Sequence, residues 1–274
     1  MPTPTANELT VASFNMERFF DTVNDPSTSD PVLTQTAFDK RLDKASQIIR
    51  GVDRYPDVIG VEEMENLTTL QAVASKVNAD AQSIDLLPNP NYVAYLVEGN
   101  DIGGIDVGFL VKESRVTTVS VTQYNKTETY TNPNTGGLET LNDRPPLVLN
   151  ATIPRPAGGT FAFTVIVNHL RSLSGIDDNT VSGSGTEGAR VRAKRQAQAV
   201  SLANLIQSFQ NADPSARIIT VGDMNAFQLN DGYVDVIGTI KGTPAPDNQT
   251  VVLGDGADLV NPDLTDLVDT LTAN

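Results

Sequence analysis

Two segments of this 274-residue chain place acidic side chains directly after apolar runs that are typical of buried strands. One run leads through a glycine to Asp223 and Asn225, and another leads to Glu62 and Glu63. Because strand side chains alternate, one of the two glutamates should point to the core and the other away from it. A carboxylate fixed there suits Mg²⁺, which takes one or two carboxylates and keeps several waters, and the Asn225 amide could orient a phosphate oxygen. The alternatives are an Asx-turn that ends a strand and acids at the start of a helix.

Two further apolar runs end in residues that could complete such a site. Asn15 offers a neutral oxygen ligand, although an Asn after a strand is also a common turn residue. His169 is the only histidine, and Arg171 follows it by two residues. With a pKa near the unperturbed value of about 6.5, an imidazole can donate a proton to a leaving oxygen at neutral pH. A single histidine is more often structural than catalytic.

Composition restricts the chemistry further. The absence of Cys excludes disulfides, thiol catalysis and Cys-based zinc sites, and a single His excludes a three-His zinc centre. No apolar run approaches the ~20 residues of a membrane helix. With 34 acidic and 19 basic residues the net charge is −15, so broad capture of nucleic acid is disfavoured. Positive charge for phosphates must be local or come from a metal. The basic segment 190–195 could supply it, or could be a solvated helix face.

These side chains require elements that bring strand ends together. Short runs rich in β-branched and aromatic residues predict strands at 9–14, 58–61, 92–97, 107–111, 116–121, 147–153, 160–167 and 218–221. Apolar stripes at helical spacing predict helices at 38–49, 66–77 and 187–209, the last capped by Thr186. Polar segments 125–142 and 173–188 are expected to be long loops. Helices with one apolar face would cover two packed sheets, so we expect an α+β fold with one domain at 9–274 after a linker at 1–8.

The order and spacing of the four strand ends resemble the endonuclease/exonuclease/phosphatase superfamily, the deoxyribonuclease-I-like fold, over nearly the whole chain. The most specific part is Gly-Asp-Met-Asn at 222–225 in combination with Val-Glu-Glu at 61–63 and Asn-His-Leu at 168–170. The resemblance implies a four-layer α/β/β/α sandwich, with two mainly antiparallel sheets packed face to face and helices outside.

The resemblance also implies roles for individual residues. Glu62 stands where many members have Gln, and Asp106 is the expected partner that orients His169. The segment Asp-Arg-Pro-Pro at 143–146 resembles one that touches substrate phosphate, although it could be only a turn. The expected roles are metal binding for Glu63 and Asn15, catalysis for His169, Asp223, Asn225 and Asp106, and phosphate contact for Arg144, to which the residue pattern adds Arg171.

The expected function is therefore a metal-dependent phosphodiester hydrolase, foremost a nuclease, in which water attacks phosphorus in line with the leaving group. Mg²⁺ is the expected cofactor, with Mn²⁺ or Ca²⁺ as alternatives, and nucleic acid or another phosphoester is the expected partner. A phosphatase, a phospholipid or inositol-phosphate phosphoesterase and a non-catalytic binding domain remain open, as does the oligomeric state. The family's closing Leu-Asp-[His/Tyr] and Ser-Asp-His motifs are missing from 258–274, so we expect a C-terminally incomplete chain with impaired activity. The Thr-rich, Cys-free, acidic composition suits a secreted bacterial domain, and a cytosolic location stays open. Residues 1–5 do not read as a secretory signal.

Overall fold

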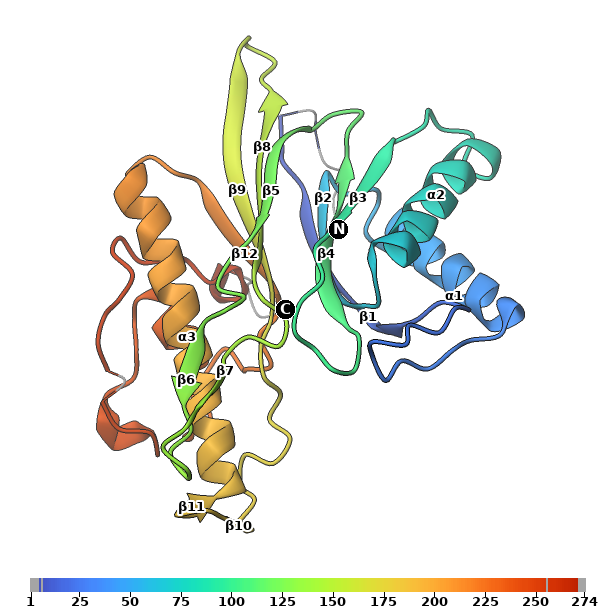
Figure 1. Ribbon diagram of the computed structural model, residues 1–274. Coiled ribbons are helices and arrows are strands. Elements are labelled where there is room, and N and C mark those ends of the chain that lie inside the picture. The colour runs from blue at the N-terminus through green and yellow to red at the C-terminus, as the bar shows by residue number, and fades with distance from the viewer. Residues whose placement is uncertain (1–4, 6, 255, 271–274) are drawn as a thin grey trace. The chain divides into compact units, whose positions relative to one another are not determined.

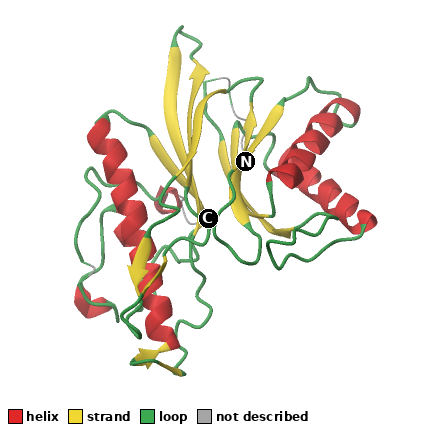
Figure 2. Cartoon of the chain, in the orientation of Figure 1, coloured by secondary structure: helices red, strands yellow, loops and turns green. Residues whose placement is uncertain are grey.

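The computed structural model describes residues 5, 7–254 and 256–270 (Figures 1 and 2). These residues form two compact units, each assembled from several segments of the chain. The first unit comprises Met1–Lys126, Asp143–His169 and Arg217–Asp223, and the second comprises Thr127–Asn142, Leu170–Ala216 and Met224–Asn274. Each unit is described by itself below.

The first unit contains two four-stranded sheets. One has the order β1 (Val11–Phe19), β2 (Val58–Met64), β4 (Asp106–Lys112), β3 (Tyr92–Leu96), and the other has the order β12 (Ile218–Asp223), β9 (Thr160–His169), β8 (Leu147–Pro154), β5 (Thr117–Gln123). β1 runs parallel to β2 and β12 runs parallel to β9, whereas the other pairs are antiparallel. Each parallel pair therefore brings two carboxyl ends to the same edge of its sheet.

The two sheets of the first unit pack against each other through an apolar layer. Val58 from β2, Phe109 from β4 and Leu149 from β8 are all buried in it. Gly60 allows the closest approach, because a Cβ atom there would lie 2.8 Å from Val221 Cγ2 and 2.9 Å from Val167 Cγ2. The absence of a side chain at this position thus permits β2 to lie directly against β9 and β12.

Helices α1 (Gln35–Gln47) and α2 (Leu67–Ser83) cover the other face of the first sheet (Figure 1). Side chains that alternate with the inter-sheet layer, such as Ile59 and Val61, meet Leu70 and Val77 of α2 in a second apolar cluster. α1 continues into a π-helical turn, Ile48–Val52, and Thr34 and Asn66 cap α1 and α2 with side-chain oxygens.

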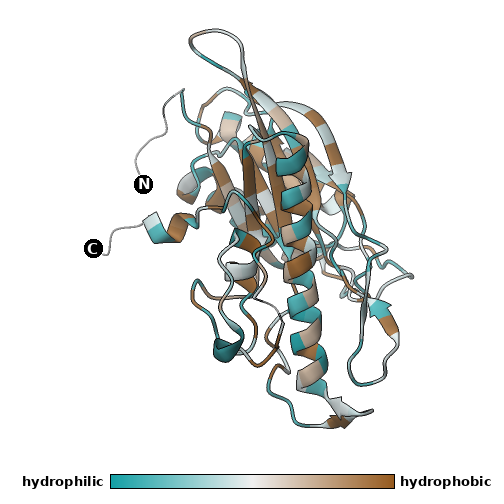
Figure 3. Cartoon of the chain, turned by 90° about the vertical axis from the view of Figure 1, so that its left-hand side faces the viewer, coloured by the Kyte–Doolittle hydropathy of each residue, from teal (hydrophilic) through white to brown (hydrophobic). Residues whose placement is uncertain are grey.

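The second unit is built on the long helix α3 (Glu187–Ala212), which Thr186 caps as predicted. It also contains α4 (Val236–Lys241), the hairpins β6 (Thr129–Thr131) with β7 (Leu138–Thr140) and β10 (Val181–Ser182) with β11 (Gly185–Thr186), and single 3₁₀ turns at Asp247–Gln249 and Leu267–Thr270. Hydrophilic and hydrophobic residues alternate along α3 (Figure 3). Polar side chains are buried there, among them Arg195 and Gln198.

The structure confirms the predicted α+β fold with two mainly antiparallel sheets packed face to face. Three layers of the predicted sandwich lie in the first unit, and the remaining long helix, α3, belongs to the second. The predicted strands and helices are present with shifted ends; the largest shift is in α2, which continues to Ser83, and β1 continues to Phe19. The prediction of long loops was wrong in part, since 125–142 contains β6 and β7 and 173–188 contains β10 and β11. α4 was not predicted, because its six residues are too short for a periodic pattern.

The basic segment 190–195 is not a solvated helix face throughout, because Arg195 is 1% exposed and Lys194 is 7% exposed. No helix among the described residues combines the length and apolar character needed to cross a bilayer. The single domain at 9–274 stays a prediction, and residues 1–4 and 6 of the expected linker lie outside the described residues.

Candidate active site

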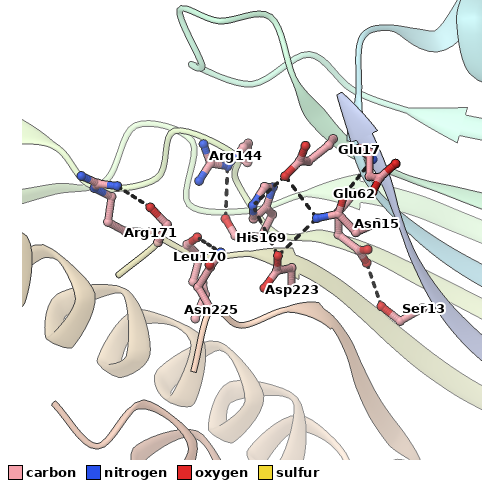
Figure 4. Close-up of polar contacts among 12 residues, drawn as sticks. Ser13, Asn15, Glu17, Glu62, Arg144, His169, Leu170, Arg171, Asp223 and Asn225 are labelled. Atoms are coloured by element: carbon pink, nitrogen blue, oxygen red, sulfur yellow. Dashed lines mark hydrogen bonds and ion pairs between the residues drawn. The ribbon is translucent and has the colours of Figure 1, made fainter. Parts of the chain in front are cut away.

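The middle of β1 and the ends of β2, β9 and β12 bring the predicted residues of the first unit together (Figure 4). Asn15 was expected to end its strand, but it lies within β1. His169 Nε2 lies 3.9 Å from Glu63 Oε1 and 4.0 Å from Asp223 Oδ2. Asn15 Nδ2 donates to Glu63 Oε1 and to Asp223 Oδ2, at 3.2 Å in both cases. Residues separated by up to 208 positions in sequence therefore form one polar group.

The backbone at two strand ends directs the carboxylates into this group. Glu63 has a φ of 59°, and the pairing of β2 with β4 shifts register beside it. Gly222 has a φ of 128°, and a Cβ there would lie 2.0 Å from the carbonyl oxygen of Asn168. Only glycine fits that contact, and it places Asp223 directly across from His169 in the sheet.

Glu62 and Glu63 differ in environment, as strand alternation predicts. Glu62 is 1% exposed, and its Oε1 accepts a hydrogen bond from Ser13 Oγ at 2.9 Å. Burial, reinforced by the nearby charges of Asp223 and Glu63, raises the pKa of Glu62 to about 8 despite the Ser13 hydrogen bond. Glu62 is therefore mostly protonated at neutral pH and adds no full negative charge to the site.

His169 is buried and neutral at pH 7. Burial, followed by the positive charge of Arg144, lowers its pKa to about 4, although Asp223 and Glu63 act in the opposite direction. The sequence-based expectation of a pKa near the unperturbed value was wrong for this reason. The neutral ring presents Nε2 to the carboxylates, and Nδ1 has no hydrogen-bond partner among the described residues.

No hydrogen bond joins the side chains of Asp106 and His169 in the described part of the chain, so their expected pairing stays a prediction. The Asp106 carboxyl group interacts with Glu98 and with the backbone of Gly99. Burial and the adjacent Glu98 raise the pKa of Asp106 to about 8. Asp106 Oδ1 is itself buried without a partner in the described structure. A buried carboxyl beside a second carboxyl favours its protonated form, and a catalytic role of Asp106 stays a prediction.

Arg144 is anchored inside the first unit. Its Nη1 lies 2.6 Å from Asp101 Oδ2, and its Nε donates to the carbonyl oxygen of His169 at 3.3 Å. Asp101 has no strand-end signal in the sequence, and only the fold identifies it as the residue that holds Arg144. Contact of Arg144 with a phosphate stays a prediction.

Arg171 and Asn225 belong to the second unit. Arg171 donates from Nη1 to Ser172 Oγ at 2.7 Å and from Nη2 to the Ser174 carbonyl at 3.0 Å. Asn225 adopts a left-handed backbone with a φ of 47°, and its Nδ2 donates to the Leu170 carbonyl at 3.1 Å. Both side chains are thus held by neighbours within their own unit.

The group of the first unit has the composition of a divalent-cation site. One atom each from Glu63, His169 and Asp223 lie within 4.8 Å of one another. The two carboxylates suit Mg²⁺ or Mn²⁺, whereas a neutral imidazole is a ligand that transition metals prefer. Asn15 was expected to offer its oxygen, but Asn15 Oδ1 accepts from the backbone N–H of Glu17 at 2.9 Å. Its amide nitrogen faces the carboxylates and holds them together.

Comparison with known proteins identifies the family of this chain. The model of the endonuclease/exonuclease/phosphatase family matches residues 10–253. No curated protein matches the sequence significantly. A β-hairpin deletion mutant of beta toxin from Staphylococcus aureus is similar in structure with a TM-score of 0.50 and 15% identity, covering 86% of this chain and 73% of that one.

Two other solved structures show weaker similarity. A family protein from Bacteroides thetaiotaomicron gives a TM-score of 0.48 at 16% identity, with coverage of 85% of this chain and 67% of that one. D. rerio TDP2 complexed with single strand DNA product gives 0.45 at 19% identity, with coverage of 86% and 66%. The chain thus spans about two thirds of the length of these last two proteins. Because the family model matches most of its length, the chain belongs to the endonuclease/exonuclease/phosphatase family.

Proposed function

We propose that this protein is a metal-dependent phosphodiester hydrolase that acts as a nuclease. The observation that supports the proposal is the group of Glu63, His169 and Asp223, whose ligand atoms lie within 4.8 Å of one another at the ends of β2, β9 and β12. The family membership and the Asn15 hydrogen bonds to both carboxylates support it further.

Glu63 and Asp223 would hold the cation, which when bound would neutralise charge that develops on the phosphoryl oxygens, and His169 would stay free of it to act as the acid. Asp223 orients the attacking water and accepts its proton. His169 is neutral in the free protein, but an anionic phosphoester at Nε2 would raise its pKa, because a nearby negative charge favours the protonated ring. The protonated His169 then donates to the leaving oxygen. Asn225 holds a non-bridging oxygen.

The substrate of the proposed reaction is a nucleic acid or a smaller phosphodiester. The net charge of −15 disfavours broad binding to a duplex, so binding depends on local groups such as Arg144 and Arg171. Mg²⁺ is the proposed cation, with Mn²⁺ and Ca²⁺ as alternatives. A location outside the cell remains our expectation from composition.

The test compares hydrolysis of plasmid DNA, single-stranded DNA, bis(p-nitrophenyl) phosphate, a phosphomonoester and a phospholipid. Each is measured with Mg²⁺, Mn²⁺ or Ca²⁺ and again with EDTA. Glu63→Gln should lower turnover by roughly 100-fold or more, whereas the matched variant Glu113→Gln, also on the first unit, should retain wild-type turnover. Cleavage of the phosphomonoester or phospholipid alone would support the alternative phosphoesterases. A folded chain that hydrolyses none of these substrates would instead support a non-catalytic binding domain.

A further inference from the structure

Arg195 of α3 is a fully buried cation whose two Nη groups donate to backbone carbonyls, whereas its Nε has no partner among the described residues. It is 1% exposed, and burial lowers its pKa. Its Nη2 donates to the carbonyl of Asn225 at 2.9 Å, and its Nη1 donates to the carbonyl of Arg171. The carboxylate it interacts with, Asp231, is 3.9 Å away. A guanidinium buried with so little charge compensation is costly to the fold, which suggests a role other than stability.

Gln198, one turn further along α3, holds the same segment from the other side. It is 2% exposed. Its Oε1 accepts from the backbone N–H of Arg171 at 2.7 Å, and its Nε2 donates to the Leu141 carbonyl at 2.9 Å. We call Arg195 and Gln198 the α3 clamp. The clamp fixes both backbone polar groups of Arg171, so this residue has little freedom to turn.

The clamp joins two loops of the second unit that carry predicted phosphate contacts. One loop contains Arg171 and the other contains Asn225, and Asn225 Nδ2 also donates to the Leu170 carbonyl. Asn225 therefore has its carbonyl held by Arg195 and its side chain held by the neighbouring loop. Its left-handed backbone is one that asparagine tolerates better than most residues, and these contacts hold it there.

We propose that Arg195 is a positioning residue that presets the Asn225 side chain for a phosphate oxygen by tying the 170–171 and 225 loops together, with Gln198 completing the clamp. The proposal rests on the proposed function. The physical reason is that a side chain placed before substrate arrives stabilises the transition state without reorganisation. Apolar packing of α3 is provided by other residues, such as Leu202 and Ile206.

A double-mutant cycle distinguishes positioning from a merely structural role. Arg195→Met should lower kcat for bis(p-nitrophenyl) phosphate by about 30-fold or more, since Asn225 loses its preset position, while KM changes less than about threefold. In an Asn225→Ala background the same substitution should lower kcat further by less than about threefold, because residues acting through one another are not additive. Arg195→Lys, which keeps the charge, should recover part of the loss.

Gln210→Leu is the matched control, because it removes a buried donor to the Pro262 carbonyl near the other end of α3. It should leave kcat unchanged. Multiplicative effects of Arg195→Met and Asn225→Ala, or a folded Arg195→Met protein with more than half of the wild-type kcat, would overturn the proposal.

Hydrogen exchange tests the clamp without any activity. Arg195→Met should raise amide exchange at 170–172 and 224–226 by about tenfold, and Gln210→Leu should not. If the wild-type protein hydrolyses none of the substrates, the proposed function is wrong. Amide exchange at 170–172 and 224–226 would then still show whether Arg195 orders these segments. Unchanged exchange would overturn the clamp itself, and Arg195→Lys provides the same readout if Arg195→Met fails to fold.

Discussion

Glu62→Gln should stabilise the protein in a pH-dependent manner. Glu62 is 1% exposed, and burial raises its pKa to about 8 from 4.5. Between these values the native state binds one proton more than the unfolded chain, so the free energy of unfolding falls as pH rises. At about 1.4 kcal/mol for each pH step, the loss reaches about 3 kcal/mol by pH 7 and about 5 kcal/mol above pH 8. Glutamine keeps the shape and the oxygen to which Ser13 donates, and it carries no charge.

The measurement is urea unfolding of wild type and Glu62→Gln between pH 4.5 and pH 8.5 in EDTA, so that no cation compensates the carboxylates. The two proteins should be equally stable near pH 4.5. As pH rises, the free energy of unfolding of the variant should increasingly exceed that of wild type. Glu17→Gln is the control, because its exposed pair with Lys44 at 3.5 Å contributes little. A difference between wild type and Glu62→Gln that does not depend on pH would refute the reasoning, since it would show that Glu62 is ionised in the native state as in the unfolded one.

Three other outcomes are expected. Gly60→Ala should lower the free energy of unfolding by about 1–3 kcal/mol, because its methyl group would lie 2.8 Å from Val221 Cγ2. The control Gly51→Ala meets nothing within 4 Å and should change the free energy of unfolding by less than about 0.5 kcal/mol. Equal effects of the two substitutions in urea titrations would contradict the close sheet packing. In EDTA the NMR signal of His169 should titrate with a midpoint near pH 4. The contribution of the neutral ring to the free energy of unfolding should be lost as pH falls from 6.5 towards 4. A midpoint near pH 6.5 would show that the ring is solvated. Mn²⁺ should raise the melting temperature of wild type, since it binds only the folded chain. Glu63→Gln should remove most of that shift. An equal shift in wild type and Glu63→Gln would show that the cation binds elsewhere.

The strand ends could be predicted from sequence because their signals are local. A run of β-branched residues followed by Gly-Asp or Glu-Glu defines a strand and its end within about ten residues. The positions of Glu63, His169 and Asp223 could thus be selected from the residue pattern alone. The short hairpins and α4 could not be predicted, because two to six residues carry no detectable period.

The chemical state of each side chain depended on contacts that sequence does not contain. The pKa of His169 follows from its burial and from Arg144, and the neutral state of Asp106 follows from its burial beside Glu98. Asn15 faces the carboxylates with nitrogen rather than oxygen because a backbone N–H occupies its oxygen. In the sequence Arg195 is one basic residue among several, yet in the fold it is the most deeply buried of them.

The sequence by itself determined the residue types at the strand ends, the alternation that separates Glu62 from Glu63, and the α+β fold. Only the tertiary structure decided which atoms meet and which groups are charged. The physical reason is that periodicity and turn residues act over a few positions, whereas desolvation and hydrogen bonding act between segments brought together by folding, as Asn15 and Asp223 are across 208 positions.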